Sequence, residues 1–137
     1  MLKKLLFLIL LAGAAFALLA WPRINDVTTG QTPQYPDLQD RGYAASEDRV
    51  ADAVQDAIGS LPRWTLQGSG KGPGGASIQA LRKTRTGFVD EVTIRIRREA
   101  GRTLVKVRSR SRTGQIDFGQ NARNIRELFA ALDAKVR

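Results

Sequence analysis

Six basic side chains in the C-terminal half of the chain recur largely at alternate positions, a spacing that could concentrate positive charge. They are Arg95, Arg97, Lys106, Arg108, Arg110 and Arg112. Because alternate residues of a β-strand point to the same face of a sheet, two paired strands would bring these side chains together. Such a face could bind anionic groups of a lipid or of a partner protein. The pattern equally suits a solvent-exposed sheet face without a ligand, and the sequence leaves both interpretations open.

A second group of polar residues lies in the segment 109–121, just before a predicted helix. It comprises Ser109, Ser111, Asp117 and Asn121. Backbone N–H groups at a helix N-terminus can receive an anion, so this segment could recognise a ligand or a partner. The alternative is structural, with Asp117 capping the helix and Asn121 bonding loop carbonyls.

The composition argues against catalysis, because the chain contains neither histidine nor cysteine. Histidine is the side chain that titrates near neutral pH, and it is the commonest transition-metal ligand. A hydrolase-like enzyme would have to use Asp90, Glu91 or Asp117. Asp90 and Glu91 would point to opposite faces of a strand, so they would not form a catalytic pair. We therefore predict no catalytic, metal-binding or cofactor-binding residues, and a chain that is not an enzyme.

A glycine-rich segment, residues 68–75, contains Lys71 and has the composition of a phosphate-binding loop. Its spacing does not match. Such a loop has Gly five residues before its Gly-Lys pair and Ser or Thr after it. Those two positions hold Thr65 and Gly72. We expect a flexible loop between two strands.

The N-terminal segment 1–21 is apolar, and Leu5 to Trp21 contains no charged or strongly polar side chain. These seventeen residues are slightly short of the roughly 20 that span a bilayer and longer than the apolar part of most signal peptides. Ala15 and Ala17 have the spacing of a signal-cleavage site, whereas Trp21 suits the headgroup region of a bilayer. The segment is therefore predicted to be either a retained membrane anchor or a cleaved signal.

The remainder of the chain predicts one α+β domain. Residues 22–45 are rich in proline and polar side chains and suit an extended linker or a strap, and residues 46–137 form the domain. Hydrophobic periodicity predicts helices over 47–59 and about nineteen residues from Asp117, with strands at 63–67, 77–86, 91–98 and 102–111. This order indicates helices that cover one face of a four-stranded, mostly antiparallel sheet.

The C-terminal helix is predicted from one apolar stripe and a capping box. The stripe consists of Phe118, Ala122, Ile125, Phe129, Leu132 and Val136. Asp117 would be the N-cap, and Gln120 would complete the box by reaching back to it.

Three segments of this domain resemble a known family. The run 107–121, VRSRSRTGQIDFGQN, resembles the R-S-x-S-R-x-G-x-x-D-x-G-x-N signature of the small bacterial and plastid proteins called domain of unknown function 1499. Residues 25–29 are similar to the family's short opening motif, and residues 87–90 to its Asp-bearing segment in mid-domain. The resemblance covers residues 24–132. It implies an exported or membrane-associated location and no particular activity.

Charge and location together suggest what this domain meets. The formal net charge of +9 lies entirely in residues 76–137, which carry fifteen basic and six acidic side chains. Lys3 and Lys4 would hold the N-terminus in the cytoplasm, which places the domain on the outer face of the cytoplasmic membrane, or outside the cell after signal cleavage. Nucleic acid is an unlikely partner there. We expect an accessory or binding module that contacts anionic lipid headgroups or a membrane protein, or alternatively a structural subunit of a larger membrane complex.

Overall fold

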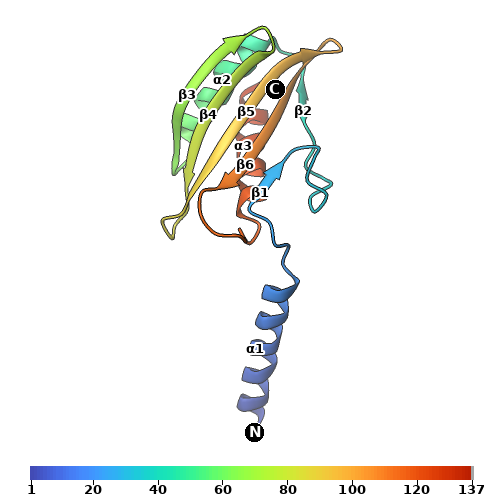
Figure 1. Ribbon diagram of the computed structural model, residues 1–137, viewed down its shortest axis with the longest axis vertical. Coiled ribbons are helices and arrows are strands. Elements are labelled where there is room, and N and C mark those ends of the chain that lie inside the picture. Colours follow the sequence, from blue (N-terminus) through green and yellow to red (C-terminus); the bar gives the residue numbers. More distant parts are fainter. Residues whose placement is uncertain (137) are drawn as a thin grey trace.

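The computed structural model describes residues 1–136, and its N-terminal helix stands apart from the rest (Figure 1). This helix, α1 (Leu2–Ala20), has 19 residues, none of them buried. At 1.5 Å per residue it is about 28 Å long, close to the thickness of the hydrocarbon core of a bilayer. It is long and apolar enough to cross a membrane, as signal sequences near an N-terminus also are. The predicted N-terminal apolar helix is confirmed.

An antiparallel sheet forms the centre of the domain, with the strand order β1-β6-β5-β4-β3, and β2 also pairs with β6. The strands are β1 (Asp26–Thr28), β2 (Arg41–Tyr43), β3 (Trp64–Gly72), β4 (Gly75–Lys83), β5 (Val89–Glu99) and β6 (Arg102–Ser111). The predicted α+β class is confirmed, but the sheet has six strands and not four. The two additional strands lie in the segment 22–45, which therefore forms one edge of the sheet.

Two helices, α2 (Glu47–Ser60) and α3 (Gln120–Val136), cover one face of this sheet (Figure 1). They pack against each other and against the inward-facing residues of the long strands. On β5 these inward residues are Val92, Ile94 and Ile96, all at most 1% exposed. The alternation that predicts this strand therefore describes the buried face correctly, and the opposite face of the sheet is left to solvent.

The glycine-rich segment 68–75 is a β-hairpin, so the prediction of a flexible loop is wrong. Its residues continue β3 and begin β4, and Gly72 pairs with Gly75. Gly75 has φ +107°, and a Cβ atom there would lie 2.0 Å from the carbonyl oxygen of Ile96. Glycine is thus required at position 75 because the neighbouring strand approaches the backbone closely.

The start of α3 also differs from the prediction. The helix begins at Gln120, and Phe118 lies before it with φ +51° and 45% of its surface exposed. Phe118 is therefore not part of the buried stripe. The Gln120 side chain donates to Asn124 Oδ1 at 2.7 Å, so the predicted capping box does not form. Backbone turns at Phe118 and Gly119, both with positive φ, displace the helix start by about one turn.

Candidate functional site

The outer face of the sheet carries the basic residues singled out by their spacing. Because side chains alternate along β5 and β6, five of them share the face that no helix covers: Arg95, Arg97, Lys106, Arg108 and Arg110. Arg112 follows the end of β6. Register places Arg95 directly opposite Lys106 on the neighbouring strand. The structure thus brings the alternating basic residues onto one surface.

In the part of this surface nearest α1, carboxylates bind three of the cations. Arg108 forms a two-point ion pair with Asp26 of β1, with Nε 3.0 Å from Oδ1. Glu91 accepts hydrogen bonds from Arg110 at 2.8 Å and from Arg112 at 3.0 Å. These bonds lower the pKa of Glu91 below its usual value, and the bond to Asp26 raises the pKa of Arg108.

Carboxylates also neutralise the cations in the part of this surface farther from α1. Lys106 lies 3.3 Å from Asp40, and its Nζ also donates to the carbonyl of Thr29 at 3.1 Å. Arg97 pairs with Glu99 at 2.8 Å. Four carboxylates thus accompany six cations, and this outer surface is far less positive than the sequence pattern alone suggests.

Arg95 is the exception in this set. Among residues 1–136 it is the only one of the six cations with neither an ion pair nor a side-chain hydrogen bond. It is exposed, and it lies opposite another cation, Lys106. Like charges directly opposite each other on a sheet are destabilising. Arg95 is therefore the cation most available to an external anion.

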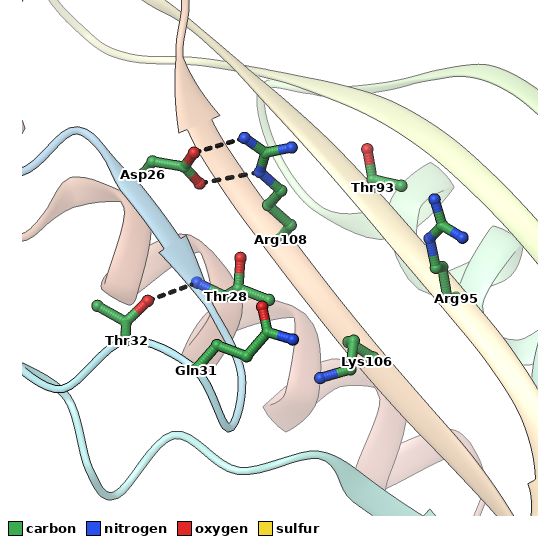
Figure 2. A pocket seen from close by; sticks show the side chains of 8 residues that line it. All are labelled: Asp26, Thr28, Gln31, Thr32, Thr93, Arg95, Lys106 and Arg108. Carbon is green, nitrogen blue, oxygen red and sulfur yellow. Dashed lines mark hydrogen bonds and ion pairs between the residues drawn. The ribbon is translucent and has the colours of Figure 1, made fainter.

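Arg95 lines one side of a recess of about 680 Å³ on this face (Figure 2). Its lining is polar, and it consists of Asp26, Thr28, Gln31, Thr32, Thr93, Arg95, Lys106 and Arg108. The volume is within the range of small-ligand sites, which is about 300–1,000 Å³. The guanidinium of Arg95 could bind an anionic group, while the threonine hydroxyls and the Gln31 amide offer further hydrogen bonds.

On the opposite, helix-covered face, the four polar residues of segment 109–121 form part of a buried hydrogen-bond network. Asn121 is its centre and is fully buried. Its Oδ1 accepts from Ser109 Oγ at 2.7 Å, and its Nδ2 donates to Ser111 Oγ and to Asp117 Oδ2, both at 2.8 Å. The same Nδ2 lies 3.0 Å from the carbonyl oxygen of Asn25.

Asn124 extends this network to a buried carboxyl group. Its Nδ2 donates to Asp90 Oδ2 at 2.8 Å and to Ser109 Oγ at 3.1 Å. Asp90 is only 1% exposed. The three segments that carry the family resemblance, residues 25–29, 87–90 and 107–121, therefore meet at one place between the sheet and α3.

The helix N-terminus in this network is already occupied by a carboxylate. Asp117 Oδ1 accepts from the amide of Gly119 at 2.8 Å, and Oδ2 lies 3.4 Å from the amide of Asn121. Because Asp117 fills the position that an external anion would take, the geometry favours the structural interpretation of segment 109–121.

Burial of Asp90 predicts an unusual dependence of stability on pH. Desolvation raises the pKa of Asp90 more than hydrogen bonds from Asn124 and Ser111 lower it. A folded-state pKa above the unfolded value of about 3.9 means that the folded chain binds the proton more tightly. The contribution of Asp90 to the free energy of unfolding is therefore present at low pH, and it is lost as pH rises through the folded-state pKa. The stability of wild type relative to Asp90→Asn should therefore fall as pH rises above about 4, as measured by urea unfolding at several pH values on both sides of that pH.

Asp37→Asn provides a control of opposite sign. A hydrogen bond from Arg126 lowers the pKa of Asp37, which is exposed. Wild type should gain stability relative to this variant as pH rises toward the unfolded value of about 3.9, whereas the loss expected for Asp90 lies above that value. If both variants gave the same slope, the protonation of Asp90 described above would be wrong.

Several residues of these two sites are not apparent from the sequence. Asp26 and Asp40 lie roughly 65 to 80 residues away along the chain from the cations that they bind. Thr28 and Gln31, which line the recess, come from the same distant segment. The spacing of Asn124 could have identified it, because it lies three residues after Asn121 and therefore on the same, buried side of the helix.

Comparison with known proteins identifies a family whose model covers all three segments that meet between the sheet and α3. The model of a family described as protein of unknown function (DUF1499) matches residues 20–132. No curated protein and no solved structure matches the chain. The match spans α1's last residue, the whole sheet and most of α3, and it includes all three segments of the buried network. The chain belongs to the DUF1499 family.

Proposed function

We propose that this chain is a membrane-tethered binding module, not an enzyme, and that the recess around Arg95 receives an acidic group of a membrane-protein partner. In this proposal α1 is retained as a single membrane span. The domain lies on the outer side of the cytoplasmic membrane, because Lys3 and Lys4 keep the N-terminus inside.

The tether is supported by the exposure of α1. Its apolar side chains make a continuous surface, and none of them is buried against the domain. A soluble protein rarely leaves so large an apolar surface in water. A bilayer would cover it, and Trp21 at the end of the helix suits the headgroup region.

The observation that carries the binding proposal is the unpaired charge of Arg95. Within residues 1–136 the other five of the six cations each have a carboxylate partner, and Arg95 instead faces Lys106. An external carboxylate would relieve this repulsion and accept charge-assisted hydrogen bonds. The polar recess beside Arg95 provides the space for it.

The position of the recess favours a protein partner over a headgroup in the bilayer plane. Lys106 lies five residues before Ser111, where β6 ends on the side of the domain nearest α1 (Figure 1). At about 3.3 Å per residue, Lys106 and the opposite residue Arg95 lie about 17 Å along the strand from that end of the domain. The acidic side chains of a neighbouring membrane protein can reach that position more easily than a headgroup can.

The environment of Asp90 supports a role without catalysis. Asp90 lies on the helix-covered face, on the opposite side of the sheet from the recess, and it is bonded within the core. A substrate in the recess would have no contact with it. Glu91 and Asp117 are held by arginines and by backbone amides, respectively.

We expect Arg95→Gln to weaken binding of an oligoglutamate peptide to the full chain in neutral detergent by about tenfold or more, the effect of losing a hydrogen bond to a charged group. Isothermal titration calorimetry at low salt measures it. Arg49→Gln is the matched control, because exposed Arg49 lies on α2, away from the recess. Equal affinity of the two variants, or no binding by wild type at low salt, would refute the proposed site.

A further inference from the structure

Two loops form the end of the domain nearest α1, and we call them together the rim. One is residues 84–88, between β4 and β5, and the other is residues 112–119, between β6 and α3. Figure 1 places both at the end from which the chain leaves toward α1. The second loop is bonded to the residue after the first loop, because the amide of Arg112 donates to the carbonyl of Val89 at 3.0 Å. It is also bonded to the connection to α1, because the amide of Asp117 donates to the carbonyl of Ile24 at 3.0 Å.

The rim carries two of the three exposed large apolar side chains of the domain. Among residues 22–136 the exposed large apolar side chains are Leu66, Phe88 and Phe118. Phe88 is 56% exposed and Phe118 is 45% exposed. Both belong to the end of the domain that faces α1: Phe88 closes the turn that begins at Thr84, and Phe118 lies two residues before the start of α3.

Phe118 is held outward by an uncommon backbone conformation. Its φ of +51° is a left-handed conformation that non-glycine residues rarely adopt, and it is followed by Gly119 with φ +77°. Such strain persists where the surrounding structure imposes it, often at functional sites. The ring centroid of Phe118 is 6.3 Å from that of Trp21. Any interface that receives Trp21 would therefore also receive Phe118.

Four unpaired cations lie in the first loop of the rim or in segments next to the rim. They are Arg23, Arg63, Lys83 and Arg85, all exposed and all without an ion pair or a side-chain hydrogen bond among residues 1–136. The backbone bond from the amide of Lys83 to the carbonyl of Arg63 holds the turn before β3 beside the first loop. The loop 84–88 itself contains no acidic residue.

We infer that the rim is a second membrane contact, in which Phe88 and Phe118 enter the headgroup region of the bilayer while these four cations bind anionic lipid phosphates. The inference rests on the tether of the proposed function. Aromatic rings with neighbouring basic residues are typical of surfaces that lie at a membrane interface. The rim continues directly from α1 through Trp21, so a bilayer that holds α1 lies at the same level.

This contact would fix how the domain stands on the membrane. With α1 as the single attachment, the domain could turn about the short connection at residues 21–25. With the rim docked, the long strands rise from the bilayer and the recess around Arg95 is held at a constant height. Lipid contact and partner binding would then use different surfaces of the domain.

A fluorescent probe on one introduced cysteine tests this inference, because the chain has no native cysteine. Thr86→Cys places the probe in the rim, and Ser69→Cys places it on β3, toward the opposite end. The full chain is reconstituted in phosphatidylcholine vesicles, with or without phosphatidylglycerol, that carry a nitroxide quencher on the headgroup. We expect strong quenching at position 86 and little at position 69. Anionic lipid should shift the docking equilibrium by about fivefold for each cation that contacts it.

Replacing both Phe88 and Phe118 by serine in the Thr86→Cys background should reduce quenching to the level at position 69, while the chain stays with the vesicles through α1. Equal quenching of wild-type chains at positions 86 and 69, in vesicles that retain the chain, would overturn the rim contact alone. Loss of the chain from the vesicles on flotation would overturn the tether and this inference with it.

Discussion

Asn121→Ala is expected to lower the free energy of unfolding by about 2–4 kcal/mol, more than other substitutions in the same segment. The Asn121 side chain is fully buried and bonds to Ser109, Ser111 and Asp117. Alanine would leave the hydroxyl of buried Ser109 with one partner fewer and remove the link between β6 and the start of α3. Unfolding in urea of the full chain in neutral detergent measures the change.

Gln115→Ala is the matched control for this prediction. Gln115 lies in the same segment and is exposed, so its loss should change stability by no more than about 0.5 kcal/mol. If Asn121→Ala were as stable as Gln115→Ala, the network would contribute little to stability, and its structural role would be wrong.

Replacing Ile9 and Leu10 of α1 by arginine is expected to remove the chain from the membrane fraction. An arginine at the centre of a membrane-spanning helix costs about 2.5–3.5 kcal/mol on insertion scales, so two cost about 5–7 kcal/mol. Both side chains are more than half exposed and contact no other part of the domain that could compensate. Alkaline extraction of membranes, followed by immunoblotting, measures the loss.

The exchange Ile9→Leu with Leu10→Ile changes the same positions without charge and should leave the chain in the membrane. Retention of the double-arginine variant in alkali-washed membranes would contradict insertion of α1. Binding through the domain alone would then have to account for membrane association.

The sequence predicts those parts of the fold that have a strong local pattern. The alternation of Val92, Ile94 and Ile96 with polar residues predicts β5, and β6 is predicted at its observed bounds. β1 and β2 are three residues each and have no visible period. They exist because β6 offers unpaired backbone groups along its free edge, a long-range cause that a local pattern does not contain. The glycines of 68–75 suggest a loop, yet Gly68, Gly70 and Gly72 lie in β3 because that strand pairs with β4.

In the candidate site, too, the sequence predicts features with a local pattern and misses those that depend on long-range contacts. Strand periodicity places Arg95 and Lys106 on one face, but the neutralisation of that face by Asp26 and Asp40 depends on how the N-terminal segment folds back on β6. Sequence spacing therefore identifies the surface and overestimates its charge. Only the contacts reveal that Arg95, among the six cations of the predicted site, has no ion pair within residues 1–136. The burial of Asp90 depends likewise on Asn124, 34 residues farther along the chain.

The intact mass of the protein extracted from its native membrane tests the central claim, a retained membrane tether, most directly. The claim predicts a chain that still contains α1 and has a mass close to 15.0 kDa, allowing for removal of Met1. A shorter chain that begins after Ala17 and is recovered in the soluble exported fraction would contradict it, because α1 would then be a signal and the domain would act untethered.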